Sequence, residues 1–127
     1  MVEGQNQFSR EAVAEEFTGA DVKLLSTDPS DDVTNSTLSN VEATETTSDS
    51  DWSITSDNTA GTTTLQTTSD IAFGSTPSFT LDAIVLQSTG TVDDMIIDDS
   101  PTGDTDLTGD GDLTISAGNI SYTFGGE

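Results

Sequence analysis

The residues best suited to chemistry lie near the C-terminus, in the stretch DTDLTGDGDLTI at residues 104–115. Counted from Asp106, its aspartates and glycine follow the spacing that opens an EF-hand calcium loop, in which carboxylates and a backbone carbonyl hold the ion. A looser loop site for calcium or sodium would draw on four residues: Asp104, Asp106, Asp110 and Asp112. These aspartates are the candidate metal ligands of the chain.

A complete EF-hand also requires a glutamate at the twelfth position and a helix on each side of the loop. The twelfth position is Ala117, and Pro101 and Gly103 disfavour a helix before the loop. The Asp-Gly dipeptide inside the loop is typical of tight turns. We therefore reject the EF-hand and predict a hairpin between Leu107 and Leu113, in which a bound cation would not be needed for folding.

The charge of the chain is extreme, because 24 Asp and Glu residues stand against two basic residues, Arg10 and Lys23, for a net charge of −22. Repulsion of this size opposes folding in dilute buffer, whereas salt at about 1 M shortens the Debye length to about 3 Å and screens the repulsion. We therefore expect a protein of a salt-loving organism or of one of its viruses. The absence of a basic patch argues against nucleic acid as a partner.

Catalysis has little support in the sequence. The chain has no cysteine and no histidine, which removes thiol nucleophiles, disulfides, histidine triads and histidine-based zinc sites. The paired aspartates at 93–94 and 98–99 are adjacent in a predicted strand, so the two members of each pair point to opposite faces. Solvated positions on a sheet edge, which discourage aggregation, explain these pairs better. We expect no enzymatic activity and no cofactor.

Two further kinds of site remain as alternatives. Trp52, Phe79 and Tyr122 could form an aromatic platform for a sugar, although aromatic residues at alternating strand positions are more often core. Asn35 begins a glycosylation sequon in a predicted loop. The alternative functions are therefore a calcium- or carbohydrate-binding module for host attachment, or a cellular surface-layer or pilus-type subunit.

One helix is expected, over residues 9–17, with Ser9 as its N-cap and Gly19 near its end. We assign residues 1–20 to an N-terminal arm or helix that docks on a neighbouring subunit. Its apolar residues are the candidate assembly contacts: Phe8, Val13 and Phe17. No apolar run approaches the roughly 18 residues of a membrane span, and the N-terminus lacks the pattern of a cleaved signal peptide.

From residue 21 to residue 127 the chain consists of short β-type runs separated by Thr, Ser, Asp and Gly. The clearest run is residues 79–87, whose apolar residues on both faces indicate a strand buried between layers. The other predicted runs are 22–26, 36–43, 52–54, 62–68, 71–73, 92–98, 113–115 and 119–124. About eight short strands with frequent turns predict an all-β fold, an antiparallel β-sandwich of the jelly-roll or immunoglobulin-like kind.

In their order, these landmarks resemble small virion proteins of tailed phages, of the tail-fibre or minor structural type. After a short helix come a strand like ADVKLLSTDPSDD, an aromatic strand start like DWSIT, the segment IAFGSTPSFTLDAIVLQ, and a closing segment like LTGDGDLTISAGNISYTF. The resemblance runs from about Phe8 to Phe124. It implies a β-sandwich that forms homo-oligomers and assembles with capsid or tail proteins, and the acidity of the chain indicates a haloarchaeal host.

The sequence therefore predicts an accessory virion subunit on the tail, fibre or capsid surface of a haloarchaeal tailed virus. We expect a homo-oligomer, a trimer or a pentamer, because symmetric association would bury apolar surface that a small core lacks.

Overall fold

A computed structural model describes residues 6–29, 32–75, 78–101 and 112–125. Within these residues the chain forms one short α-helix, one 3₁₀ turn and nine strands in antiparallel sheets, which confirms the predicted all-β, sandwich-like fold. The elements are α1 (Gln7–Glu15), β1 (Asp21–Leu25), β2 (Val41–Thr46), η1 (Asp49–Asp51), β3 (Trp52–Asp57), β4 (Thr62–Thr67), β5 (Ile71–Ser75), β6 (Ala83–Gln87), β7 (Met95–Asp98), β8 (Asp112–Ile115) and β9 (Ser121–Gly125).

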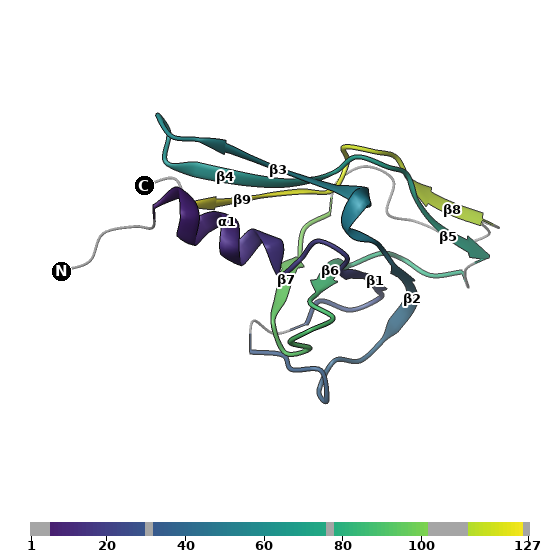
Figure 1. Ribbon diagram of the computed structural model, residues 1–127. Coiled ribbons are helices and arrows are strands. Elements are labelled where there is room, and N and C mark those ends of the chain that lie inside the picture. Colours follow the sequence, from purple (N-terminus) through teal and green to yellow (C-terminus); the bar gives the residue numbers. More distant parts are fainter. Residues whose placement is uncertain (1–5, 30–31, 76–77, 102–111, 126–127) are drawn as a thin grey trace.

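The strands lie in two layers (Figure 1). One layer is a four-stranded sheet in the order β2-β1-β6-β7. The other consists of the sheet β3-β4-β9 and the pair β5-β8. In the chain, β5 follows β4 and β8 precedes β9. The pair β5-β8 therefore continues from the pair β4-β9, as the upper layer of Figure 1 shows. The sandwich therefore has β7 at one edge of the first layer and β9 at one edge of the second.

The space between the layers is filled by apolar side chains from both sheets. Trp52 and Leu65 of the second layer meet Val22 and Leu86 of the first, together with Ile120 just before β9. All five are 8% exposed or less. Burying each such side chain contributes about 1.5–3 kcal/mol, so this cluster is the main source of stability.

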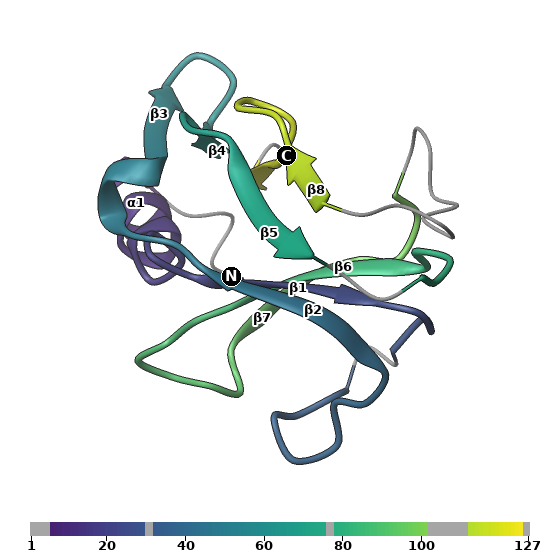
Figure 2. The same ribbon diagram turned by 90° about the vertical axis from the view of Figure 1, so that its right-hand side faces the viewer.

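Strand β6 is buried on both faces, as its sequence predicts. Ile84 and Leu86 point towards the second layer, whereas Ala83 and Val85 pack with Leu25 on the opposite face. The residues between β1 and β2 contribute Leu38 to this second face. Figure 2 shows the connection between β1 and β2 extending beyond the sheet on that side. The prediction of a strand that begins at residue 79 is wrong, because β6 begins at Ala83.

Helix α1 begins two residues earlier than predicted. Its N-cap is Asn6, whose side chain accepts a hydrogen bond from the backbone N–H of Ser9 at 2.9 Å. The chain turns after the helix at Gly19, which has a φ of 79° and takes the left-handed conformation that glycine tolerates. The helix packs on β3, β4 and β9 of its own chain (Figure 1).

One strand starts later than predicted, and one predicted hairpin is only partly described. The strand expected at 36–43 begins only at Val41, because Thr34 and Leu38 form a hydrogen-bonded turn and Asn40 has a φ of 59°. Strand β8 pairs with β5. The half of the predicted hairpin that contains Leu107 lies outside the described residues.

Candidate functional site

The predicted cation loop falls largely outside the described residues. Asp104, Asp106 and Asp110 are not described, and Asp112 begins β8. In the described part of the chain, no three acidic, histidine or cysteine side chains converge in a way that could hold a metal ion. The loop therefore stays a prediction from the sequence. No helix among the described residues is long and apolar enough to cross a membrane.

The predicted glycosylation site, Asn35, lies in an exposed turn. Its side-chain carbonyl accepts a hydrogen bond of 2.8 Å from the Nε2 of Gln87, which is 3% exposed. Its backbone N–H donates to an Asp93 carboxylate oxygen, also at 2.8 Å. The Asn35 side chain therefore holds the turn against the end of β6.

The structure does not form the predicted aromatic platform. Trp52 is 7% exposed and lies between the layers, where its indole N–H donates to Thr47 Oγ1 at 2.7 Å. Phe79 is also 7% exposed and packs with Leu24 in a separate cluster. Only Tyr122 of the three is accessible, with 43% of its surface exposed. A sugar cannot stack on side chains buried in this way.

The three predicted assembly contacts also have different environments. Phe17 is 4% exposed and belongs to the core between the layers, so the expectation that it is available to a neighbouring subunit is wrong. Val13 is partly buried against the same core. Phe8 is 78% exposed and remains accessible. The helical spacing indicates an apolar face but not which part of it the chain's own sheet covers.

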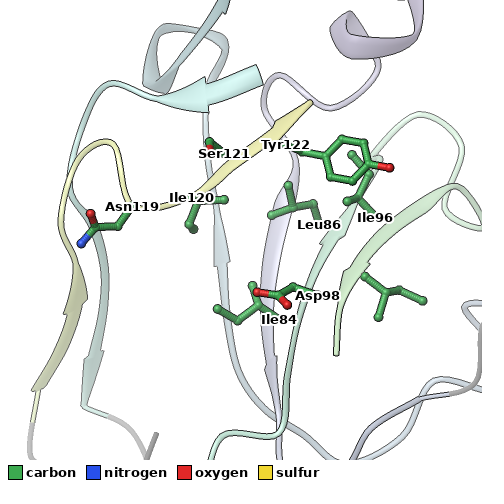
Figure 3. A pocket seen from close by; sticks show the side chains of 9 residues that line it. Ile84, Leu86, Ile96, Asp98, Asn119, Ile120, Ser121 and Tyr122 are labelled. Atoms are coloured by element: carbon green, nitrogen blue, oxygen red, sulfur yellow. The ribbon is translucent and has the colours of Figure 1, made fainter. Parts of the chain in front are cut away.

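A groove opens between the edge strands β7 and β9. It consists of two adjoining cavities of about 310 Å³ and about 550 Å³, which share Ile96, Ile97 and Tyr122. We call it the β7–β9 groove. Its smaller cavity extends to β6 and its larger one to the end of α1. Figure 3 shows the smaller cavity, with the Tyr122 ring and Ile96 at one end and Asn119 on the far side of Ile120.

The middle of the β7–β9 groove is apolar. Leu86 and Ile96 come from paired positions of β6 and β7. Ile120 and Tyr122 lie opposite them, just before β9 and within it. The Tyr122 ring packs edge-on against Phe124, with ring centroids 4.8 Å apart and an interplanar angle of 73°. This T-shaped contact fixes the ring beside the opening. The groove therefore offers a preformed apolar surface.

Both ends of the groove are acidic. Asp98, at the end of β7, lines the smaller cavity, and Glu16, Asp93 and Asp94 line the larger one. Desolvation by neighbouring protein atoms, followed by the neighbouring Asp94 carboxylate, raises the pKa of Glu16. The side chains of Glu16 and Asp94 lie close enough to share a hydrogen bond. Negative charge is therefore concentrated on both sides of the apolar middle.

This arrangement is suited to binding. It provides apolar contact, carboxylates at two ends, and two strand edges. Within the described residues, β7 pairs only with β6 and β9 pairs only with β4, so each has one unpaired edge. Sequence reasoning identified the aspartate pairs as edge residues, which their exposure and the position of β7 support. The sequence did not predict the β7–β9 groove, because the groove forms only where β7 and β9 lie next to each other in the fold.

Comparisons of this chain with protein-family models, with curated protein sequences and with solved structures found no match.

Proposed function

We propose that this protein is a non-enzymatic structural subunit of a virus particle, an accessory component on the tail, fibre or capsid surface of a haloarchaeal tailed virus. The sandwich fold, the small size and the order of sequence landmarks support this assignment. The groove supports a binding role within the particle. The proposal includes self-association as a trimer or pentamer and contact with other virion proteins.

The observation that carries the proposal is the distribution of charge. Arg10 is 4% exposed, and Lys23 is half-buried in β1, which lies between β2 and β6. None of the Asp and Glu residues is buried in the described part of the chain. The surface therefore exposes carboxylates with almost no basic partners. Such a surface favours folding where concentrated salt screens it and holds water and cations around the protein.

Phe8 supports the self-association. Because its aromatic side chain is 78% exposed, Phe8 contributes little to the stability of the monomer. It would stabilise any contact that removes the ring from water. Molar salt screens the repulsion between acidic copies that would otherwise oppose such a contact. Symmetric packing around Phe8 is therefore the proposed route to an oligomer.

Three observations test the assignment. Particles from haloarchaeal cultures, purified on a density gradient, are analysed by mass spectrometry, and peptides of this chain are expected to co-sediment with infectivity. Neighbouring genes are expected to encode capsid or tail proteins. Peptides found only in the cellular fraction, together with neighbouring genes for metabolic enzymes, would contradict the proposal. Light scattering of the purified protein in molar salt measures the number of copies in the oligomer.

A further inference from the structure

We propose that the β7–β9 groove binds an extended segment of a different protein, in which two basic residues flank an apolar residue. This inference rests on the proposed structural role and names the chemistry of the partner. The segment would add to the free edge of β7, with its apolar side chain in the middle of the groove and its basic side chains at the two acidic ends.

The edge of β7 supplies the backbone contacts. A strand at a sheet edge presents unpaired N–H and C=O groups that an extended peptide can pair with. Ile96 faces the core, and its side chain lines both cavities. A peptide along β7 would therefore bring every second side chain to the apolar middle of the groove, because side chains alternate between the two faces of a strand.

The positions of the carboxylates set the spacing of the basic residues. Asp94 and Asp98 are four residues apart, and Ile96 lies midway between them. Along an extended chain, side chains two residues apart point to the same face, so these three share one face. Four residues of strand span about 13 Å. A matching segment would carry Lys or Arg at two positions four apart, with an apolar residue between them. Glu16 adds a second carboxylate beside Asp94.

A second copy of this chain does not fit the groove. Its acidic ends require positive charge, and the whole chain has only Arg10 and Lys23. Arg10 is 4% exposed and bound to the sheet through Thr63, and Lys23 lies in a central strand. The segments outside the described residues contain no Lys or Arg either. The occupant is therefore another protein.

Salt does not remove this complementarity. Charges more than a Debye length apart are screened in brine, but pairs in direct contact and partly buried are screened much less. The apolar contact is not weakened by salt. Binding would therefore persist in molar salt and increase as salt is lowered.

The test uses fluorescein-labelled peptides and the full chain in about 1 M KCl, followed by fluorescence anisotropy. The probe contains the core KTITK, and matched peptides contain ETITE or KTSTK. The probe is expected to bind at least about tenfold more tightly than either. Amide hydrogen exchange is expected to slow at Met95 and Ile97 on binding, because their backbone N–H groups lie at the edge of β7 that faces away from β6. Equal binding of the three peptides would overturn the proposal.

Protein variants locate the site. Glu16→Gln combined with Asp94→Asn is expected to weaken probe binding about five- to tenfold while leaving the fold intact, because both side chains are at least partly exposed. The matched control, Asp28→Asn with Asp82→Asn, removes two exposed carboxylates that do not line the groove. If the two double variants weaken probe binding equally, binding depends on net charge alone, and the proposal is overturned.

The outcome is separable from that of the proposed function. A chain found in virus particles whose groove binds none of the peptides would overturn this inference alone. Specific peptide binding by a chain absent from particles would contradict the virion assignment alone. Dimerisation of the chain that Ile96→Ser abolishes would make a second copy the occupant and overturn the inference.

Discussion

Arg10 Nε donates a hydrogen bond of 3.1 Å to Thr63 Oγ1, and the Thr63 side chain is fully buried. Ser56 Oγ lies 2.9 Å from the same hydroxyl and donates to Glu11 Oε2 at 2.6 Å. Because the single hydroxyl proton of Ser56 goes to the carboxylate, the Thr63 hydroxyl donates to Ser56. Two hydroxyls of the sheet thus connect the guanidinium of Arg10 with the carboxylate of Glu11.

Replacing Thr63 by valine tests the contribution of this connection. The substitution keeps the shape and the strand preference of the side chain but removes the acceptor of Arg10 and the donor to Ser56. We expect Thr63→Val to lower the free energy of unfolding by about 1.5–3 kcal/mol, the range for a hydrogen bond to a charged group. Urea unfolding at constant molar salt measures the change.

Thr55→Val is the matched control, because Thr55 is exposed on the outer face of β3, adjacent to Ser56. Its effect is expected to stay within about 0.5 kcal/mol. A Thr63→Val protein as stable as the control would mean that the buried network contributes nothing measurable.

The sequence predicts elements whose signals are local and misses those that depend on distant partners. Strand β4 agrees with its predicted range because alternating residues define its two faces. The N-cap of α1 lies three residues before the predicted one because Asn6 and Ser9 are both good N-caps, and the choice depends on how the helix packs on the sheet. The β7–β9 groove joins strands more than 20 residues apart in the chain, and no local pattern predicts that meeting.

Phe8 and Phe17 provide a second test, because Phe8 in α1 is exposed whereas Phe17, just after the end of α1, is buried in the core. Phe8→Ser is expected to change the free energy of unfolding of the monomer by no more than about 0.5 kcal/mol and to reduce self-association in molar salt. Phe17→Ala removes a core side chain and is expected to cost about 3–5 kcal/mol. Light scattering and urea unfolding measure the two effects.

If Phe8→Ser leaves the oligomeric state unchanged, the helix surface is not the contact between copies. If it instead destabilises the monomer as strongly as Phe17→Ala, Phe8 packs on the protein in solution.

Asp51 predicts an acid-sensitive component of stability. Hydrogen bonds from the Ser48 backbone N–H, at 2.9 Å, and from its hydroxyl lower the pKa of Asp51 below its ordinary value of 3.8. The folded state therefore binds this proton less readily than the unfolded chain. The stabilisation is complete above pH 3.8 and is lost as the pH falls through the lower pKa of the folded state.

We expect Asp51→Asn to be less stable than the parent at neutral pH and to lose less stability on acidification over that window. Circular dichroism melts at several pH values in molar salt measure both quantities. Asp49→Asn in the same 3₁₀ turn is the control, because the Asp49 side chain is exposed. Parallel pH profiles for Asp51→Asn and the parent protein would contradict the assignment.

The most direct consequence of the charge is a requirement for salt. The melting temperature is expected to rise steeply between about 0.1 M and 1 M KCl, as the Debye length falls from about 10 Å to about 3 Å, and to change less above that range. Replacing exposed carboxylates by amides reduces the repulsion in the folded state. The triple variant combines three such substitutions: Asp28→Asn, Asp32→Asn and Asp82→Asn. This triple variant is expected to melt at a higher temperature in low salt and to approach the parent protein in high salt.

Sucrose at an equal osmotic strength is the control for general exclusion from the surface, which stabilises a protein without screening its charge. It should raise the melting temperatures of the parent and of the triple variant by similar amounts, and so leave their difference in low salt intact. KCl, in contrast, should remove that difference, because only screening acts on the charges that distinguish the two proteins. A difference that sucrose and KCl remove equally would contradict the screening argument on which the proposed high-salt environment depends.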